Sequence, residues 1–458
     1  MDYPYASLAL PSQAALQLQY VGKKLVDLPT PAVVLDRAKV RKNCEAMLDV
    51  CGKLGVGFRA HVKSHKTLEL SKLQVGPALD KPANFIVSTL VEAENLLPFL
   101  LECQANGRES SVRTPPRTVL YGVPPAPTTL PRLTHLASKL RPGCVNILID
   151  SIESFNKLKD GLVAAKIGVF IKVDTGYQRA GMTTASQKFP RLIRKVVGTV
   201  GEEFRGFYSH YGHSYAGNSE KDAAHGLISE LEGLEEAAAA IEENYLALLS
   251  NRIVLTVGAT PTATAAMNML SGSPRAAEFK TLLNRLKETF AVELHAGVYP
   301  LLDMQQVATH ARPASGRAAL TKDGVGIKVL LEISSVYDER EKPEALASAG
   351  SLALGREPCK SYPGWGIVTG ELGNDGNVVY DERGDRTGWI VGRISQEHGI
   401  LTWEGPEHDM KPLDIGSKVL VWPNHACVAG AGFGWYLIVD TEKDSHTVLD
   451  VWVRWRGW

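Results

Sequence analysis

The strongest constraint on the fold is the alternation of short apolar segments with helix-like segments along the first two-thirds of the chain. Helix-like stretches such as 37–54, 151–165 and 219–242 separate the apolar segments. Strands that alternate with helices form parallel sheets, and about eight of them close into a barrel. We therefore expect an α/β fold, a (β/α)8 barrel, with strands at 32–35, 58–62, 84–87, 118–121, 145–149, 168–173, 204–208 and 253–257.

The pattern changes near residue 325, where helical spacers disappear. Gly, Asp and Pro turns separate the later apolar segments, which is typical of an all-β domain. We expect the barrel to span 25–323 and a C-terminal β domain to span 324–458. Its predicted strands are 327–336, 366–368, 378–380, 387–395, 400–403, 417–423, 434–439 and 447–455.

Two polar stretches interrupt the barrel pattern. Residues 104–117 and 271–275 are rich in turn-forming residues. Such stretches are typical of surface loops. We interpret both as insertions that carry no chemistry.

Composition narrows the class of partner. Fifty basic residues balance fifty acidic ones, so overall charge favours neither nucleic acid nor an anionic membrane surface. The six cysteines include no CxxC pair, which favours a reducing compartment. The chain shows no signal-peptide pattern and no run of eighteen apolar residues. We expect a cytoplasmic protein that binds a small molecule.

A basic cluster, Arg59-Ala60-His61-Val62-Lys63-Ser64-His65-Lys66, follows the second apolar segment. Strand alternation would place His61, Lys63 and His65 on one face. Neighbouring positive charges disfavour the ammonium form of a lysine, and a neutral amine is the form that attacks an aldehyde. The cluster therefore suits a lysine that forms a Schiff base. The alternative is a solvated basic turn.

A His-x-Cys motif, His425 and Cys427, lies in a segment with strand character. In an extended strand, residues two apart point the same way with Cα atoms roughly 6.6 to 6.8 Å apart, so the imidazole and the thiolate can converge on one ion. Nitrogen and sulfur donors suit zinc. Two ligands are fewer than the four of a closed structural site. The alternative is a buried thiol beside a hydrogen-bonded histidine.

Other polar residues follow predicted barrel strands. Active sites of such barrels lie at the carboxyl ends of the strands, so Arg179 is expected to project into the site, unless it only pairs with Asp174. Residues 207–215 hold two tyrosines and two histidines, which pack as core or loop residues in the competing interpretation. Glycine turns at 255–262 and 293–300 would let backbone amides approach a phosphate group.

The segment Asp27-Leu28-Pro29-Thr30-Pro31-Ala32-Val33-Val34-Leu35-Asp36, together with 37–54 and the basic cluster, resembles the D-serine dehydratase and D-threonine aldolase group of fold-type III pyridoxal phosphate enzymes. The resemblance implies a barrel of alanine racemase type, with Lys63 carrying the cofactor. Ala60 and Ser64 depart from the proline and threonine of the family motif, and neither change removes the amine. The resemblance also suggests that residues 1–24 join the β domain.

The resemblance implies roles for further residues. The Pro-Asn-His-x-Cys segment is similar to the zinc segment of the dehydratases, which implies His425 and Cys427 as metal ligands. Arg179 is expected beside the ring nitrogen or the substrate carboxylate, and His210 or His213 as an acid, a base or an outer group. The expected cofactor contacts are Tyr208, Tyr215, Thr260, Gly297 and Val298, with Asp303 and Gln305 as neighbours.

The implied reaction is the zinc- and pyridoxal phosphate-dependent dehydration of D-serine to pyruvate and ammonia, with D-threonine as a further substrate. The alternatives are a D-threonine aldolase, which cysteine rather than aspartate at 427 disfavours, and a 3-hydroxyaspartate dehydratase, which needs one more cation for the second carboxylate. A non-catalytic pyridoxal phosphate-binding protein is a third, although a mere carrier needs neither the β domain nor the His-x-Cys motif. Related enzymes are dimers, which implies a homodimer.

Overall fold

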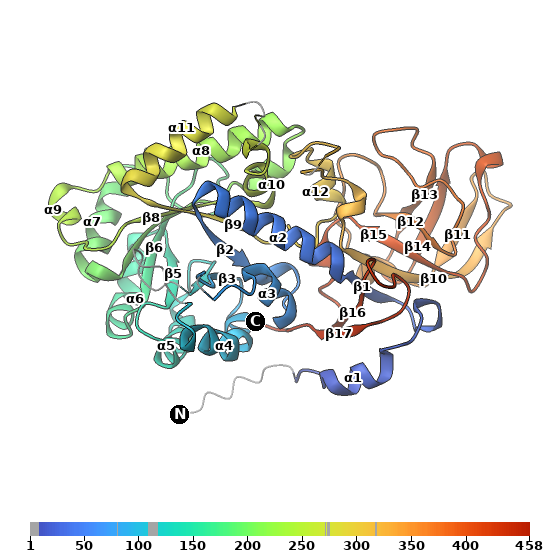
Figure 1. Ribbon diagram of the computed structural model, residues 1–458, viewed down its shortest axis with the longest axis horizontal. Helices are drawn as coiled ribbons and strands as arrows, with labels where there is room; N and C mark the ends of the chain where they lie inside the picture. Colours follow the sequence, from blue (N-terminus) through green and yellow to red (C-terminus); the bar gives the residue numbers. More distant parts are fainter. Residues whose placement is uncertain (1–8, 80, 109–117, 271, 273–274, 317) are drawn as a thin grey trace.

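The computed structural model describes residues 9–79, 81–108, 118–270, 272, 275–316 and 318–458. The expected insertion at 104–117 lies outside the described residues from position 109 onward, and most of 271–275 lies outside them as well. Within the described chain, eight parallel strands close into a barrel with helices around it, and a β domain follows (Figure 1). The prediction of a (β/α)8 barrel followed by an all-β domain is confirmed.

The barrel strands pair in sequence order, and the last pairs with the first. Side chains such as Ile86, Leu148 and Phe170 fill the interior, so the barrel is a packed core and only its ends are open to ligands. The strands are β2 (Gly57–His61), β3 (Phe85–Val87), β4 (Val119–Tyr121), β5 (Val145–Ile149), β6 (Gly168–Lys172), β7 (Phe204–Tyr208), β8 (Val254–Val257) and β9 (Ala291–Ala296).

The strand predicted first in the barrel belongs to the other sheet. Segment β1 (Ala32–Asp36) pairs with β10 (Ile327–Tyr337) and β16 (Trp435–Val439) of the β domain. The place of the eighth barrel strand is taken by β9, where the sequence had indicated only a glycine turn. The apolar pattern identified β1 as a strand, but a local pattern does not determine which sheet a strand joins.

Local sequence signals mark where helices begin and end. For example, α2 begins after Asp36, whose side chain accepts hydrogen bonds from the first turn, and it ends at Gly55 in the left-handed conformation. The remaining long helices bury one apolar side against the barrel. The barrel helices are α2 (Arg37–Leu54), α3 (Leu68–Val75), α4 (Leu90–Ala105), α5 (Leu130–Lys139), α6 (Ile152–Ala164), α7 (Phe189–Val200), α8 (Glu220–Ala239), α9 (Glu243–Leu246), α10 (Thr260–Ala265), α11 (Ala276–Thr289) and α12 (Met304–Ala308).

The β domain is built on a nine-stranded sheet in the order β11-β14-β13-β12-β15-β10-β1-β16-β17. The predicted strand at 378–380 is wrong, because these residues follow a turn and make no ladder, and β11 was not predicted. The strands besides β1 are β10 (Ile327–Tyr337), β11 (Glu344–Ala347), β12 (Gly366–Leu372), β13 (Gly388–Ile394), β14 (Gly399–Glu404), β15 (Lys418–Pro423), β16 (Trp435–Val439) and β17 (Asp450–Val453).

Three short helices accompany the β domain. Helix α1 (Gln13–Tyr20) packs Leu16 and Tyr20 onto the sheet near β1 and β16. Helix α13 (Ser351–Leu354) packs against helix α14 (Ala426–Ala429), and α14 contacts the barrel turn at 62–64. No helix in the described ranges combines the length and the apolar character that a membrane crossing requires.

Candidate active site

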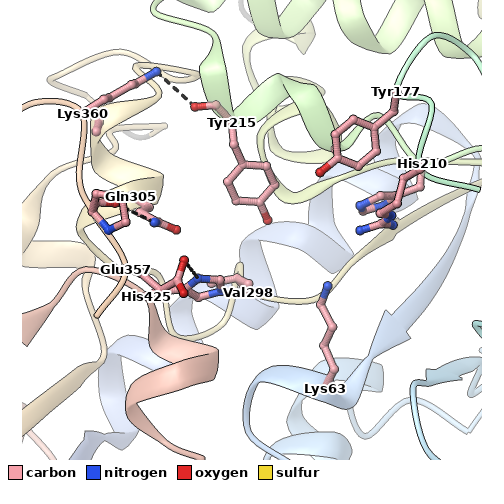
Figure 2. Close-up of a pocket in the computed structure, with 13 residues that line it drawn as sticks. Lys63, Tyr177, His210, Tyr215, Val298, Gln305, Glu357, Lys360 and His425 are labelled. Carbon is pink, nitrogen blue, oxygen red and sulfur yellow. Dashed lines mark hydrogen bonds and ion pairs between the residues drawn. The ribbon is translucent and has the colours of Figure 1, made fainter. Parts of the chain in front are cut away.

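A cavity of about 320 Å3 lies between the carboxyl end of the barrel and the β domain (Figure 2). The barrel contributes residues that directly follow β2, β6, β7 and β9, and the β domain contributes two separate segments. Active sites of (β/α)8 barrels lie at this end. The lining residues are Lys63, Tyr177, Arg179, His210, Gly212, Tyr215, Val298, Gln305, Ala308, Glu357, Pro358, Lys360 and His425.

Lys63 enters the cavity from a tight turn. The prediction that Lys63 and His65 continue a strand is wrong, because β2 ends at His61 and residues 62–64 form one turn of 3-10 helix. The Ser64 hydroxyl donates to the Gly297 carbonyl (2.7 Å), which fixes this turn against the loop after β9. The Lys63 amine points into the cavity in Figure 2, and no hydrogen bond or ion pair holds it among the described residues.

His210 presents a neutral imidazole to the cavity. Its Nδ1 lies 2.8 Å from the Gly258 carbonyl, which only accepts, so Nδ1 carries the proton and Nε2 has a free lone pair. Burial lowers the pKa of His210 well below its ordinary value, and the charges of Lys63 and other neighbours add to this effect. His61 has a lowered pKa for the same reasons. His213 is the outer histidine and packs on the Tyr211 ring.

Arg179 lines the cavity as a cation without a protein counter-ion in the described chain. Its guanidinium lies over the Tyr177 ring, 5.0 Å from the centroid. The alternative ion pair with Asp174 does not form within the described residues, because Asp174 instead accepts hydrogen bonds from the backbone of Gly176 and Gln178. The Arg179 guanidinium is therefore available to an anionic or electron-rich ligand.

The predicted cofactor contacts separate into two groups. Tyr215 and Val298 line the cavity, and Thr260 supports them by accepting a hydrogen bond from the Val298 amide (3.1 Å). Gly297 lies directly behind Lys63, where a Cβ would approach the Lys63 Cε to 3.4 Å. Tyr208 is not among the lining residues. It stacks on His295 inside the barrel, with ring centroids 4.4 Å apart.

The His-x-Cys motif lies on a helix start, so the prediction of an extended strand is wrong. Strand β15 ends at Pro423, and His425 precedes the first turn of α14, which holds Cys427. The two side chains still meet. Burial lowers the pKa of His425, but Cys427 and the carboxylates of Asp303 and Glu357 outweigh burial and raise this pKa to about 9. The environment of His425 therefore attracts positive charge.

One side of the cavity was not predicted from the sequence. Glu357, Pro358 and Lys360 come from the connection between α13 and β12, which has no recognisable motif. The Lys360 ammonium donates to the backbone carbonyls of Tyr215 (3.1 Å) and Gly217, so it ties the β domain to the loop after β7. Tyr177, which also lines the cavity, was missed although it lies only two residues before Arg179.

Glu230, a fully buried residue of α8, was also missed. Its carboxylate accepts hydrogen bonds from the Ser209 hydroxyl, the Gly258 amide and the Thr262 hydroxyl, each at 3.1 Å. Burial raises the pKa of Glu230 to about 7, against these hydrogen bonds, which lower it. The residue connects the loops after β7 and β8, and it holds the Gly258 turn whose carbonyl orients His210.

The residues at the cavity fit pyridoxal phosphate. An unpaired lysine amine suits an aldehyde, and Arg179 and the neutral His210 suit a polar heteroaromatic ring. The turn at Gly258 requires glycine, because its φ is +145° and a Cβ would lie 2.2 Å from the His295 carbonyl oxygen. The carbonyl of this turn accepts a hydrogen bond from His210, so the turn positions a cavity residue.

The His425 and Cys427 pair fits a zinc ion with open coordination positions. The buried Nδ1 of His425 has no hydrogen-bond partner among the described residues, and the Glu357 carboxylate lies 4.0 Å from it. No group of three His, Cys, Asp or Glu side chains within the described ranges converges as a metal site, so the protein would supply two ligands. Two ligands leave positions for substrate and water.

Two family models match the chain. Residues 35–271 match the alanine racemase N-terminal domain, and residues 326–439 match the putative serine dehydratase domain. These spans include barrel strands β2 to β8 and the β-domain strands from β10 to β16, with His425 among them. The match therefore covers both sides of the cavity.

Curated relatives match the whole length. The chain is 35% identical to the D-serine dehydratase of Schizosaccharomyces pombe, covering 97% of this chain and 95% of the relative. It is 33% identical to the D-serine dehydratase of Saccharomyces cerevisiae, covering 96% and 99%. The structure of D-threo-3-hydroxyaspartate dehydratase from Delftia sp. HT23 superposes with a TM-score of 0.70 at 24% identity, covering 95% of this chain and all of that one.

Proposed function

We propose that this chain, which belongs to the D-serine dehydratase family, dehydrates D-serine to pyruvate and ammonia with pyridoxal phosphate and zinc as cofactors. It is a lyase of the dehydratase type on the strength of its full-length relatives. The observation that carries the assignment of substrate and cofactors is that Lys63 and His425 line one cavity, although they lie 362 positions apart in the sequence.

Different residues of the chain would act at different atoms of the cofactor and the substrate. Lys63 would hold the aldehyde carbon of the cofactor, and its Nζ would accept the proton that leaves the substrate α carbon. The Arg179 guanidinium would hold the ring nitrogen or the substrate carboxylate, and the His210 Nε2 would accept a hydrogen bond from a ligand group. Pyridoxal phosphate supplies an electron-withdrawing ring that stabilises negative charge at the α carbon.

Departure of the β hydroxyl is the difficult step, because hydroxide is a poor leaving group. A zinc ion on His425 and Cys427 would supply Lewis acidity at that hydroxyl. A metal-free form of the related 3-hydroxyaspartate dehydratase has been described, which is consistent with a metal site in the family. Tyr215 and Gln305 border this side of the cavity and would exclude bulk water from it.

D-threonine is proposed as a further substrate, and D-threo-3-hydroxyaspartate is the second candidate. Against the latter, the ammonium of Lys360 at the cavity wall already donates to the Tyr215 and Gly217 carbonyls. We also propose a cytoplasmic homodimer. The six free cysteines suit a reducing compartment.

The test is to assay pyruvate and ammonia from D-serine, with D-threonine, D-threo-3-hydroxyaspartate and L-serine as comparisons, before and after zinc is removed with a chelator. We expect D-serine turnover that is lost with zinc and restored by adding it, while the cofactor absorbance persists. Borohydride should fix the cofactor at Lys63. Mass added at Lys360 in place of Lys63, or full turnover in stripped protein, contradicts the assignment.

A further inference from the structure

Asp303 connects the barrel to the metal motif. It follows the loop after β9 and is 1% exposed. Its Oδ1 accepts a hydrogen bond from the Gln306 amide at 2.8 Å, which is an ordinary N-cap for α12. Its Oδ2 accepts from the Ala426 amide at 2.9 Å, and Ala426 is the residue between His425 and Cys427. The helix cap of α12 requires only the hydrogen bond to Gln306, and the bond to Ala426 is additional.

Gln305, two residues after Asp303, makes two further hydrogen bonds to the β domain. The Gln305 amide donates to the Asn424 carbonyl at 3.0 Å, directly before the His-x-Cys motif. The Gln305 side chain donates to the Pro358 carbonyl at 2.8 Å, beside Glu357. Both β-domain segments that line the cavity are therefore held by one short stretch of the barrel.

The stretch that holds these segments, residues 297–305, begins beside Lys63. Gly297 accepts the Ser64 hydroxyl next to Lys63, and Val298 lines the cavity. Residues 297–305 thus run from Lys63 at one end to the His425 turn at the other. Their geometry sets how far the amine lies from the proposed metal ligands.

The charge of Asp303 is directed at the metal motif. The carboxylate accepts backbone N–H groups, and among the described residues no ion pair offsets its charge. Its Oδ2 lies 2.9 Å from the Ala426 amide nitrogen, so the carboxylate is directly beside the backbone that joins the two proposed ligands. A cation bound there would gain from an anion that is buried, because a buried charge is weakly screened.

We propose that Asp303 is a positioning residue for zinc: it fixes the backbone between the two ligands and supplies negative charge behind them. The inference depends on the proposed zinc site. Removing outer groups that orient metal ligands typically weakens metal affinity 10- to 100-fold, and we expect a loss of about this size for Asp303→Asn. The asparagine side chain keeps the shape of aspartate. It removes the negative charge and places an NH2 group against the backbone amide of either Gln306 or Ala426.

The experiment measures zinc affinity by competition with a chromophoric chelator, using metal-stripped protein that holds pyridoxal phosphate. Asp303→Asn is compared with wild type and with Cys427→Ser, which loses a ligand. The matched control is Asp36→Asn. Asp36 is 3% exposed, caps α2 through the Ala38 amide, and accepts from the Thr441 amide of the β domain, but it lies outside the cavity lining.

We expect Asp303→Asn to bind zinc about 10- to 100-fold more weakly, with the cofactor absorbance at wild-type level and with Asp36→Asn unchanged. A loss below about threefold, or an equal loss in Asp36→Asn, overturns the proposal. Loss of the cofactor in Asp303→Asn also overturns it, because a purely structural role would cause general damage. Wild type that binds no zinc instead refutes the zinc site itself, before any variant is compared.

A second variant, Ala426→Pro, tests the positioning role of Asp303 if Asp303→Asn does not fold. Ala426→Pro removes the N–H that donates to Asp303. Proline is tolerated at the first position of a helix, and His425 already has the extended backbone that a following proline requires. We expect a weaker zinc affinity in this variant too, with a smaller loss because the charge remains. Unchanged affinity in a folded Ala426→Pro protein refutes the positioning role.

Discussion

The substitution His65→Asn gives the most direct test of how the turn that carries Lys63 is stabilised. His65 is fully buried, and its Nδ1 accepts from the Thr67 amide at 3.1 Å while its Nε2 donates to the Gln74 side chain at 2.9 Å. Only the contact with Thr67 requires the neutral ring, because a protonated Nδ1 cannot accept, whereas Nε2 can donate to Gln74 in either form. Burial lowers the pKa of His65 from 6.5 to about 3, with the charge of Arg454 acting in the same direction.

The sign of the pH effect follows from this shift. The unfolded chain takes up a proton at this position near pH 6.5, whereas the folded protein does not until about pH 3. The stabilisation by neutral His65 is therefore present above about pH 6.5 and is lost as the pH falls. At about pH 5 the loss is roughly 1.5 pKa units, or about 2 kcal/mol at 1.36 kcal/mol per unit.

Asparagine keeps an acceptor for the amide two residues ahead and does not titrate. At about pH 7.5 we expect His65→Asn to lower the free energy of unfolding by roughly 1–3 kcal/mol, because it leaves the buried Gln74 oxygen unpaired. At about pH 5 the difference from wild type should shrink by about 2 kcal/mol, since only wild type must keep the ring neutral.

The assay is urea denaturation followed by tryptophan fluorescence at the two pH values. The other buried histidines are present in both proteins, so their contributions cancel in the comparison. The control is His408→Gln, whose side chain is 82% exposed. An equal difference between wild type and His65→Asn at both pH values would refute the argument that burial keeps this ring neutral.

Two further substitutions test the barrel interior and the loop behind the cavity. Arg59→Met should lower the free energy of unfolding by about 3–5 kcal/mol, because it leaves the Glu293 carboxylate buried without its 2.6 Å partner. Adding Glu293→Leu should restore most of this loss. Denaturant titration of the single and double variants measures both changes. Gly258→Ala should cost about 1–3 kcal/mol and weaken pyridoxal phosphate binding, since its Cβ would strike the His295 carbonyl oxygen. Gly22→Ala, at a positive φ with open space around it, is the control; an equal effect of both on cofactor titrations would contradict the role of the Gly258 turn.

Local sequence patterns predicted what is local in this protein. Short apolar segments between helix-like stretches located seven of the eight barrel strands, and the loss of helical spacers showed that the chain changes from α/β to all-β near residue 325. The same patterns could not assign β1 to a sheet, because its pairing with β10 and β16 depends on residues almost 300 to 400 positions away. Motif spacing brought His425 and Cys427 together correctly, but for the wrong reason, since a helix start rather than a strand holds them.

The residues that sequence reasoning missed share one property. Glu230, Glu357 and Lys360 act through contacts with backbone groups or with residues far along the chain. A buried carboxylate among leucines and alanines of α8 looks like any helical glutamate until the strands beside it are placed. Such positions carry no spacing signal, because their partners come from other elements of the fold.

The two halves of the cavity lie on different folding units, so their separation depends on how those units are joined. Two stretches of the chain join the barrel and the β domain. Strand β1 lies in the β-domain sheet and leads directly into α2 of the barrel, and the chain returns to the β domain between β9 and β10. Arg37 pairs with Asp440 at 3.0 Å at the first crossing, and the Trp455 amide donates to the Lys66 carbonyl beside the Lys63 turn. A domain joined by a single linker can rotate, whereas several crossings resist it. The distance between Lys63 and His425 is therefore fixed by the topology, which is what a reaction that needs both groups at one substrate requires.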